Sequence, residues 1–548
     1  MKLRRPGSHL EVVSWLSTAA MALALSACGK PPMTGKRSVS GHTSLLVRGN
    51  GAEPDSLDPQ RARSIEAHHI LRDLCEGLTT LDHRANPAPG VASRWTVSAD
   101  GRTYTFTLRP QARWSNGDRV VGLDFVAGLR RLVDPATASS YAQIIDAIGN
   151  AREIIAGRKP PDSLAVSAPS PDTVVIRLTA PTPYLVGLLA HPSTCPAHRP
   201  TLAISATELG KTGVWNGAFS LKEWVQGLHV LLERNRWYWN DAATRLDAVE
   251  WLHIPDEAAE LMRYRAGDLQ ISATIPRSQI DWIKAHLPDQ LHLSPQLNTY
   301  YYGFNLKRPP FGSVKLRRAL SLVVDRERLA QVILRVGERP AYGWVPPGVH
   351  EYRAQSFDYS DTPIAKRITE ARQLYAAAGY SRERPLQLEL RFNAGEVHER
   401  LALAIASMWQ HALGVEVRLQ AVEFKSLLED IDRESVEVFR SSWSADYNDA
   451  YSFLQVLRSD CGINLTHYQS AEYDALLARA SGESNGLRRA EWLQQAEGVA
   501  LRDHAVMPIY FYVNKRLVKP EVDGWYDNVL NVVYSKDLSI RSQQRVTH

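Results

Sequence analysis

The sequence predicts a mixed α/β protein with more than one domain, and three observations lead to that fold class. With 548 residues, 44% of them hydrophobic, the chain can bury a large core and is long enough for about two to four domains. Alternation of polar and apolar residues over 103–108 predicts a half-buried strand. Residues 387–392, 399–413 and 415–420 predict a strand, a helix ended by Gly414 and a second strand, which together form a βαβ unit.

The charge pattern argues against a nucleic-acid partner. The net charge is +5, but the 64 basic and 59 acidic residues are interspersed without a long run of one sign. Basic patches that bind phosphate backbones are more concentrated than this. We therefore expect no nucleic acid among the partners.

The motifs also argue against an enzyme and against a bound cofactor. His398-Glu399 lacks the second histidine of a HExxH zinc site. His68 and His69 could bind a metal, but adjacent side chains on a helix point in different directions. We expect this pair to lie on the surface.

The N-terminus is typical of an exported protein. Three basic residues precede the apolar stretch VVSWLSTAAMALALSA, which is short for a transmembrane helix. The following Cys28 completes a pattern that resembles the lipobox of bacterial lipoproteins, so residues 1–28 are expected to be a lipoprotein signal peptide, with acylated Cys28 as a membrane anchor. An uncleaved signal anchor is the alternative. Residues 29–42, rich in Pro, Gly, Ser and Lys, are expected to be a flexible tether.

Three cysteines remain beyond the tether, namely Cys75, Cys195 and Cys461. An exported chain lies in an oxidising compartment, so at most one internal disulfide is expected, with its pairing left open. The spacing does not match a structural zinc site.

Several segments, in order along the chain, carry a resemblance to a known family. They include EPDSLDPQ (53–60), FTLRPQARWSNGD (106–118), TYYYGFNLKRPPF (299–311) and WSADYNDAYSFL (443–454). Through them the sequence resembles the peptide-binding proteins of bacterial ABC importers, most closely the oligopeptide-binding members. The resemblance implies a two-lobe periplasmic-binding-protein clamshell with an accessory domain, which encloses a ligand by hinge closure on the periplasmic side of the cell envelope.

The resemblance also implies domain boundaries that the residues alone do not reveal. Lobe I is expected to consist of three pieces, residues 43–75, 199–297 and 514–548. The accessory domain is expected over residues 76–198, and lobe II over residues 298–513.

The candidate site residues are carried over from the family by position. Asp446 is expected to bind the N-terminal amine of a peptide, because a buried ammonium needs a carboxylate partner. Basic residues are expected to bind the C-terminal carboxylate, namely Arg440, His398 and Arg353. Other ligand-binding positions are Asn393, Tyr141, Trp443, Tyr512, Arg63 and Ile65. The alternatives remain open for several of them: Asp446 as a turn cap, Arg440 in a plain salt bridge, His398 as a structural residue and the aromatics as core. The aromatics at 300–302 are expected mainly in the core.

Departures from the family pattern suggest which ligands are preferred. Arg63 and Gly303 stand where the family has acids near side-chain pockets, so basic peptides should be disfavoured and acidic ones tolerated. Asn298 and Ser444 replace a pair of cysteines, so that disulfide cannot form.

The partners implied are short peptides, the permease subunits of an ABC importer and the lipid membrane, with the chain a monomer. A murein tripeptide or dipeptide binder of the same family and a transporter-independent envelope sensor are the alternatives.

Overall fold

The computed structural model describes residues 44–202, 213–483 and 485–541. The expected signal peptide with Cys28 and the expected tether lie outside the described residues. Within the described ranges, no helix is both long enough and apolar enough to cross a membrane.

The first sheet has four strands in the order β1-β10-β9-β8, in which β1 and β10 are parallel and the other neighbours are antiparallel. Helix α1 follows β1, and its N-cap Ser64 accepts a hydrogen bond from the backbone of Ala67. Helix α6 is capped at its start by Asp256 and ends at Gly267 with a positive φ of 86°. The elements are β1 (Leu45–Gly51), α1 (Ile65–Leu74), β8 (Phe219–Val225), β9 (His229–Arg234), β10 (Ala248–His253), α6 (Glu257–Ala266) and α7 (Ile280–His286).

The second sheet is antiparallel with the order β4-β5-β7-β6. The predicted strand over 103–108 is confirmed as β5, and its alternating residues Tyr104, Phe106 and Leu108 are buried. These side chains join a core that runs from Leu78 to Leu189, called here the β5 core. The elements are β2 (Thr79–Leu81), β3 (Pro87–Pro89), β4 (Ala92–Val97), β5 (Thr103–Leu108), α2 (Gly122–Val133), α3 (Ala151–Ile155), β6 (Val166–Ser170), β7 (Thr173–Arg177) and α4 (Leu185–Leu188).

The third sheet has six strands in the order β12-β16-β11-β15-β13-β14. The predicted βαβ unit is confirmed: β13 and β14 are parallel, and α11 between them ends at Gly414, whose φ is 81°. The helix begins at Glu396, three residues before the predicted start. The strands are β11 (Leu291–Phe304), β12 (Arg339–Pro340), β13 (Gln387–Asn393), β14 (Glu416–Val422), β15 (Val438–Ser444) and β16 (Met507–Leu517), and a short pair is formed by β17 (Val522–Asp523) and β18 (Ser539–Ile540).

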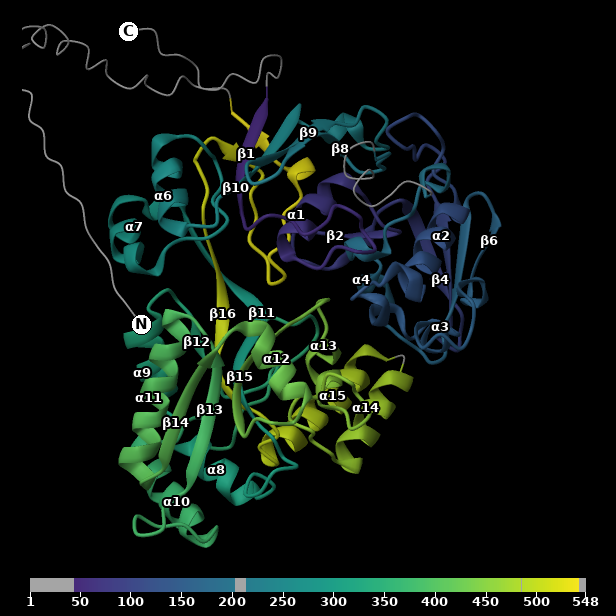
Figure 1. Ribbon diagram of the computed structural model, residues 1–548. Coiled ribbons are helices and arrows are strands. Elements are labelled where there is room, and N and C mark those ends of the chain that lie inside the picture. The colour runs from purple at the N-terminus through teal and green to yellow at the C-terminus, as the bar shows by residue number, and fades with distance from the viewer. Residues whose placement is uncertain (1–43, 203–212, 484, 542–548) are drawn as a thin grey trace, which may run out of the picture. The chain divides into compact units, whose positions relative to one another are not determined.

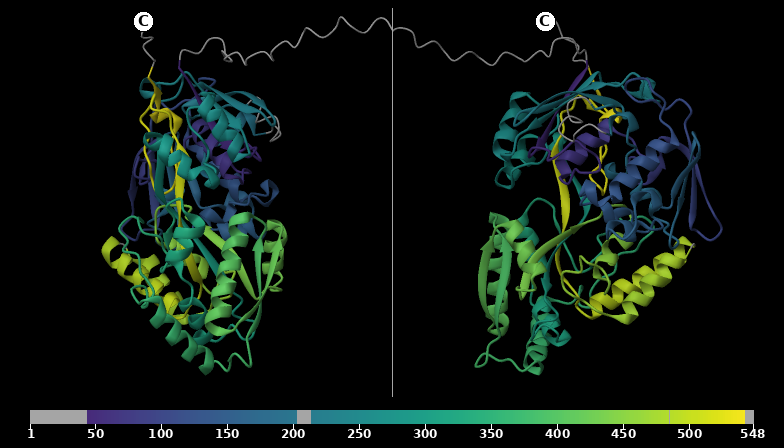
Figure 2. Two further views of the ribbon diagram at one scale, coloured as in Figure 1. Left: turned by 90° about the vertical axis from the view of Figure 1, so that its left-hand side faces the viewer. Right: turned by 45° about the vertical axis from the view of Figure 1, so that its right-hand side comes forward.

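Helices pack on this sheet and extend beyond it (Figure 1). Helices α14 and α15 lie side by side as a hairpin (Figure 2). The side chains of the region form one core from Leu297 to Tyr510, called here the β11 core. The helices are α8 (Val314–Leu322), α9 (Arg326–Arg328), the π-helix η9 (Leu329–Leu334), α10 (Ile364–Ala377), α11 (Glu396–Leu413), α12 (Phe424–Asp432), α13 (Tyr451–Leu454), α14 (Ala471–Gly482) and α15 (Gly486–Arg502).

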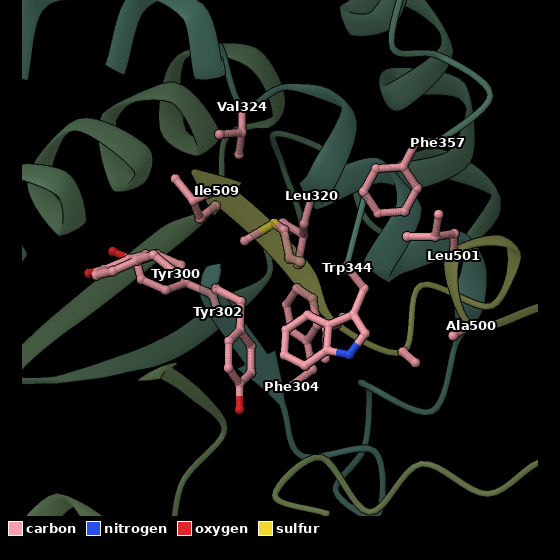
Figure 3. Packing of buried hydrophobic residues seen from close by; sticks show 14 of the residues in the cluster. Tyr300, Tyr302, Phe304, Leu320, Val324, Trp344, Phe357, Ala500, Leu501 and Ile509 are labelled. Atoms are coloured by element: carbon pink, nitrogen blue, oxygen red, sulfur yellow. The ribbon is translucent and has the colours of Figure 1, made fainter. Parts of the chain in front are cut away.

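Tyr300, Tyr301 and Tyr302 are core residues, as predicted, with at most 6% of each exposed. Figure 3 shows Tyr300 and Tyr302 beside Leu320, Trp344 and Ile509, with the Tyr300 hydroxyl directed away from the packed group. The ring of Tyr300 therefore closes the core and leaves its polar end available for other contacts.

Two long strands, β11 and β16, connect the β11 core to a separate cluster. Met507 and Tyr510 belong to the β11 core, but Leu517 at the far end of β16 packs with Leu252 and Val336 in another core. The pairing of β11 with β16 shifts register between Pro295 and Thr299. Because fewer regular hydrogen bonds join the two strands at this shift, the strands can bend there with little loss of pairing.

Cys75 and Cys195 form a disulfide across 120 residues of sequence, and Cys461 is a free thiol. The expectation of at most one internal bridge is met, and the structure supplies the pairing that the sequence left open. The expectation for the histidine pair is wrong: His68 is only 4% exposed, and burial drives the pKa of His69 well below its usual value. The His68 ring packs against His191, and the His69 ring stacks on Trp251.

We predict that loss of the disulfide destabilises the chain. Closing so long a loop restricts the unfolded state, so Cys75→Ser with Cys195→Ser should lower the unfolding free energy by about 2–5 kcal/mol in urea titrations. The variant Cys461→Ser is the control and should unfold like the wild type. Equal stability of the double variant would contradict the prediction.

Candidate functional site

Arg440 is a buried cation with neutral hydrogen-bond partners. It lies on β15 opposite Tyr302 of β11 and is 7% exposed. Its guanidinium donates to Asn393 Oδ1 and to the Tyr512 hydroxyl, both at 3.0 Å, and lies 4.7 Å above the Tyr300 ring. Its Nε has no hydrogen-bond partner. Within the described ranges no carboxylate forms an ion pair with it, so the plain salt bridge is not observed.

Tyrosines compensate part of the cost of burying this charge. Desolvation alone would lower the pKa of Arg440, but Tyr512, Tyr300 and Tyr510 raise it above the ordinary value. Tyrosines are neutral near pH 7, so they orient the guanidinium without neutralising it. The Arg440 guanidinium keeps its full positive charge, and an anion can form an ion pair with it.

His398 lies beside this cation as a neutral ring. Its Nδ1 is 3.3 Å from the Tyr300 hydroxyl. Burial, followed by the charges of Arg440 and Arg277, lowers the pKa of His398 to about 4. At neutral pH it is a hydrogen-bonding group rather than a second cation, which differs from its expected role as a basic residue.

Asp446 is a partly buried carboxylate that lacks a cation. Its backbone N–H donates to Ser452 Oγ at 3.1 Å, which fixes the turn after β15. Desolvation by burial raises the pKa of its carboxyl group from 3.8 to about 6. No hydrogen bond or ion pair to the carboxylate occurs in the part of the chain that is described. The group is therefore ready to accept a positive charge from elsewhere.

Trp443 and the strand positions around it support this turn. The Trp443 indole donates to the carbonyl of Ser452 at 2.8 Å. Asn298 and Ser444 face each other across β11 and β15, and the Asn298 amide donates to Ser444 Oγ at 2.7 Å. A hydrogen bond therefore links the two positions at which the resemblance excluded a disulfide.

Tyr141 and helix α1 are in electrostatic reach of Asp446. Burial and then Asp446 raise the pKa of Tyr141. The Tyr141 ring contacts His68 of α1, with ring centroids 5.1 Å apart. At the start of α1, Arg63 is exposed and Ile65 is 52% exposed. Arg63 and Ile65 thus lie at the start of the helix that the Tyr141 ring contacts.

Arg353 is exposed and lies apart from Arg440. Its guanidinium is 3.5 Å from Gln494 Oε1, and it makes no contact with the Arg440 group in the described structure. It lies on a segment fixed by Glu497, whose buried carboxylate accepts from Trp344 N, Val345 N, Tyr352 Oη and Gln355 N. The same segment reaches the turn after Asp446, because His350 N donates to Asn448 Oδ1 at 3.0 Å.

Glu497 was missed by the sequence reasoning. Burial raises the pKa of its carboxyl group to about 7. It lies in α15, some 145 residues from its Tyr352 partner, so no local motif could reveal the contact. A single acid in an amphipathic helix is usually a solvent-exposed residue.

The comparisons with known proteins agree with the geometry. The family described as "Bacterial extracellular solute-binding proteins, family 5 Middle" matches residues 86–464. The chain belongs to this family. It is 37% identical over 501 residues to the periplasmic oligopeptide-binding protein OppA of Escherichia coli strain K12, covering 90% of this chain and 92% of the relative.

Two solved structures of relatives share the fold. The Escherichia coli murein tripeptide binding protein MppA gives a TM-score of 0.80 at 36% identity, covering 91% of this chain and 98% of the other. Haemophilus influenzae OppA in complex with RPPGFSPFR gives 0.78 at 35% identity, covering 91% and 99%. The predicted two-lobe α/β clamshell and the predicted family are confirmed, and the chain is a member of a family of binding proteins.

We predict that Asp446 destabilises the ligand-free chain at neutral pH. With its pKa raised to about 6, the folded state holds this proton more tightly than the unfolded state. The unfolding free energy therefore falls as the pH rises from about 4 to about 6, and the penalty persists above that range. Asp446→Asn should be more stable than the wild type by about 1–2 kcal/mol at pH 7 in urea unfolding.

The internal control is the same variant at pH 4, where the wild-type carboxyl is largely protonated and the two proteins should be equally stable. A similar gain at both pH values would contradict the assignment.

Proposed function

We propose that the chain captures short peptides between its two lobes and delivers them to an ABC importer. The observation that carries the proposal is the pair of unbalanced opposite charges on β15 and the turn after it. Arg440 lacks an acid and Asp446 lacks a cation among the described residues. A molecule with an ammonium at one end and a carboxylate at the other would complete both.

The spacing of the two charges favours a short ligand. A β-strand rises about 3.3 Å per residue, so the backbone from residue 440 to residue 444 covers about 13 Å before the turn that carries Asp446. An extended peptide of three to four residues covers about 10–14 Å. Its main chain can pair as an added strand while side chains occupy pockets.

Other predicted contacts take roles that fit this arrangement. Asn393 and Tyr512 hold Arg440, and His398 as a neutral ring can donate to the same carboxylate. Trp443 and Tyr141 form walls near Asp446, with Arg63 and Ile65 at the edge. Arg353 remains a proposed contact for the C-terminus of longer peptides.

The domain boundaries remain a proposal, supported by the separate cores. We place lobe I at 43–75, 199–297 and 514–548, the accessory domain at 76–198 and lobe II at 298–513. The strands β11 and β16 contribute to two cores each, which suits a hinge between the lobes.

The relatives named above are periplasmic, and we propose the same side of the envelope for this chain. Acylated Cys28 would anchor it to the membrane, and the permease subunits of an importer would receive the peptide. We propose a monomer, because each site is complete within one chain.

A second candidate is a murein tripeptide or dipeptide binder, favoured by the MppA structure. Such a ligand also carries a free amine, so Asp446 does not discriminate. A transporter-independent envelope sensor would use the same site. Calorimetry of Ala-Ala-Ala against murein tripeptide separates the ligands.

We predict that the two charges recognise the two ends of a peptide. Asp446→Ala should weaken Ala-Ala-Ala by at least about 2 kcal/mol in calorimetry, because it leaves the buried ammonium unpaired. N-acetylated Ala-Ala-Ala should lose little. Arg440→Met is the matched variant for the other end. It should weaken the binding of Ala-Ala-Ala with a free carboxylate but leave the binding of the C-terminal amide nearly unchanged. An equal loss for capped and free peptides would refute the assignment.

We also predict a preference against basic peptides. Arg63 adds a cation, and Gly303 supplies no carboxylate. A Cβ at Gly303 would lie 2.3 Å from the Phe439 ring, so a side chain there would clash. Glu-Ala-Glu should therefore bind more tightly than Lys-Ala-Lys at low salt, and Arg63→Glu should narrow the difference. Lys-Ala-Lys binding as tightly as Glu-Ala-Glu to the wild type would show the prediction to be wrong.

A further inference from the structure

Tyr184 joins two parts of the chain that have separate hydrophobic cores. Its neighbour Leu185 is fully buried in the β5 core. The ring of Tyr184 instead packs against the β11 core. Consecutive residues therefore belong to different cores, and a relative movement of the two cores must break or strain the contact at Tyr184.

The Tyr184 ring is stacked on the turn that follows Asp446. Its centroid lies 4.7 Å from that of Tyr447, with an interplanar angle of 9°, and 5.1 Å from that of Tyr451, at 20°. The guanidinium of Arg489 lies 5.8 Å from the Tyr184 ring. Stacked aromatic rings and a nearby cation attract one another beyond the area they bury. Tyr447 directly follows the residue that we propose binds the peptide amine.

Tyr184 is held firmly on its own side. The Tyr104 hydroxyl donates to the Thr182 carbonyl at 3.1 Å, and the backbone N–H of Leu185 donates to the same carbonyl at 3.0 Å. Thr182 is 3% exposed. The turn that presents the ring is therefore fixed to the β5 core.

The receiving turn is held equally firmly. Arg489 of α15 forms two hydrogen bonds to the Asp449 carboxylate, at 2.6 and 3.0 Å. Asp449 Oδ1 also accepts from the backbone N–H of Tyr451 at 2.8 Å. Because hydrogen bonds fix the turns on both sides, the stacked rings couple the position of the β5 core to that of the β11 core.

We propose that Tyr184 is a positioning residue that latches the Asp446 turn to the β5 core and thereby slows ligand release. The inference rests on the proposed function, in which the ligand is enclosed between lobes that must separate to release it. Separation of the lobes costs the stacking contacts, which the chain forms without a ligand. The latch should therefore slow dissociation, and its removal should not slow association.

The first test follows release of Ala-Ala-Ala from the full chain by stopped-flow tryptophan fluorescence. Tyr184→Ala should release Ala-Ala-Ala about tenfold faster than the wild type without slower association. Tyr184→Phe is the matched control: it keeps the ring, and the Tyr184 hydroxyl makes no hydrogen bond in the described ranges, so wild-type rates are expected. Unchanged release from Tyr184→Ala, or equally fast release from Tyr184→Phe, would overturn the proposal.

A second test needs no ligand and separates this proposal from the proposed function. In a double-mutant cycle, Tyr184→Ala and Tyr451→Ala should give non-additive changes in the urea unfolding of the free chain, because the rings contact each other. Additive changes would overturn the latch. If the wild type fails to bind Ala-Ala-Ala, the proposed ligand is wrong and the cycle alone decides on the latch. Tyr184→Leu replaces Tyr184→Ala if the alanine variant does not fold.

Discussion

The buried charge of Arg440 is the constraint on which the site depends. A guanidinium in a closed interior is costly unless its donors are satisfied and its charge is met. Here Asn393 and Tyr512 satisfy two donors, and the Tyr300 ring supports the flat face. These partners stabilise the orientation of the cation but supply no negative charge. A ligand with a carboxylate supplies the negative charge that Arg440 lacks in the folded chain, and this interaction favours binding.

The packing around Tyr300 explains how the chain tolerates this arrangement. The central position of β11 between β15 and β16 places Tyr300 next to both Arg440 and Tyr512. One end of Tyr300 fills the β11 core (Figure 3). Its hydroxyl lies 3.3 Å from His398 Nδ1. A rigid core therefore positions the polar groups, so less conformational entropy is lost when a ligand binds.

Local elements were predictable from the sequence because their signals are local. The alternation in β5, and Gly414 as the positive-φ end of α11, are properties of a few neighbouring residues. The site needed more than that. Arg440 meets Asn393 and Tyr512 across 47 and 72 residues, and only the resemblance to a family placed them together. Glu497 and Tyr184 lie in no local motif, and their partners Tyr352 and Tyr447 are still more remote in sequence. The histidines of α1 were misjudged because their ring partners, Tyr141, His191 and Trp251, are remote in sequence.

The neutral state of His398 adds a consequence for the bound state. In the free chain, burial and the Arg440 charge favour the uncharged ring. A carboxylate placed between the two groups would offset the repulsion from Arg440 and favour a protonated ring. Binding would then raise the pKa of His398 at one end of the peptide, while at the other end an ammonium would lower the pKa of Asp446. The two ends therefore have opposite proton linkages, and the ligand that satisfies both is the zwitterion.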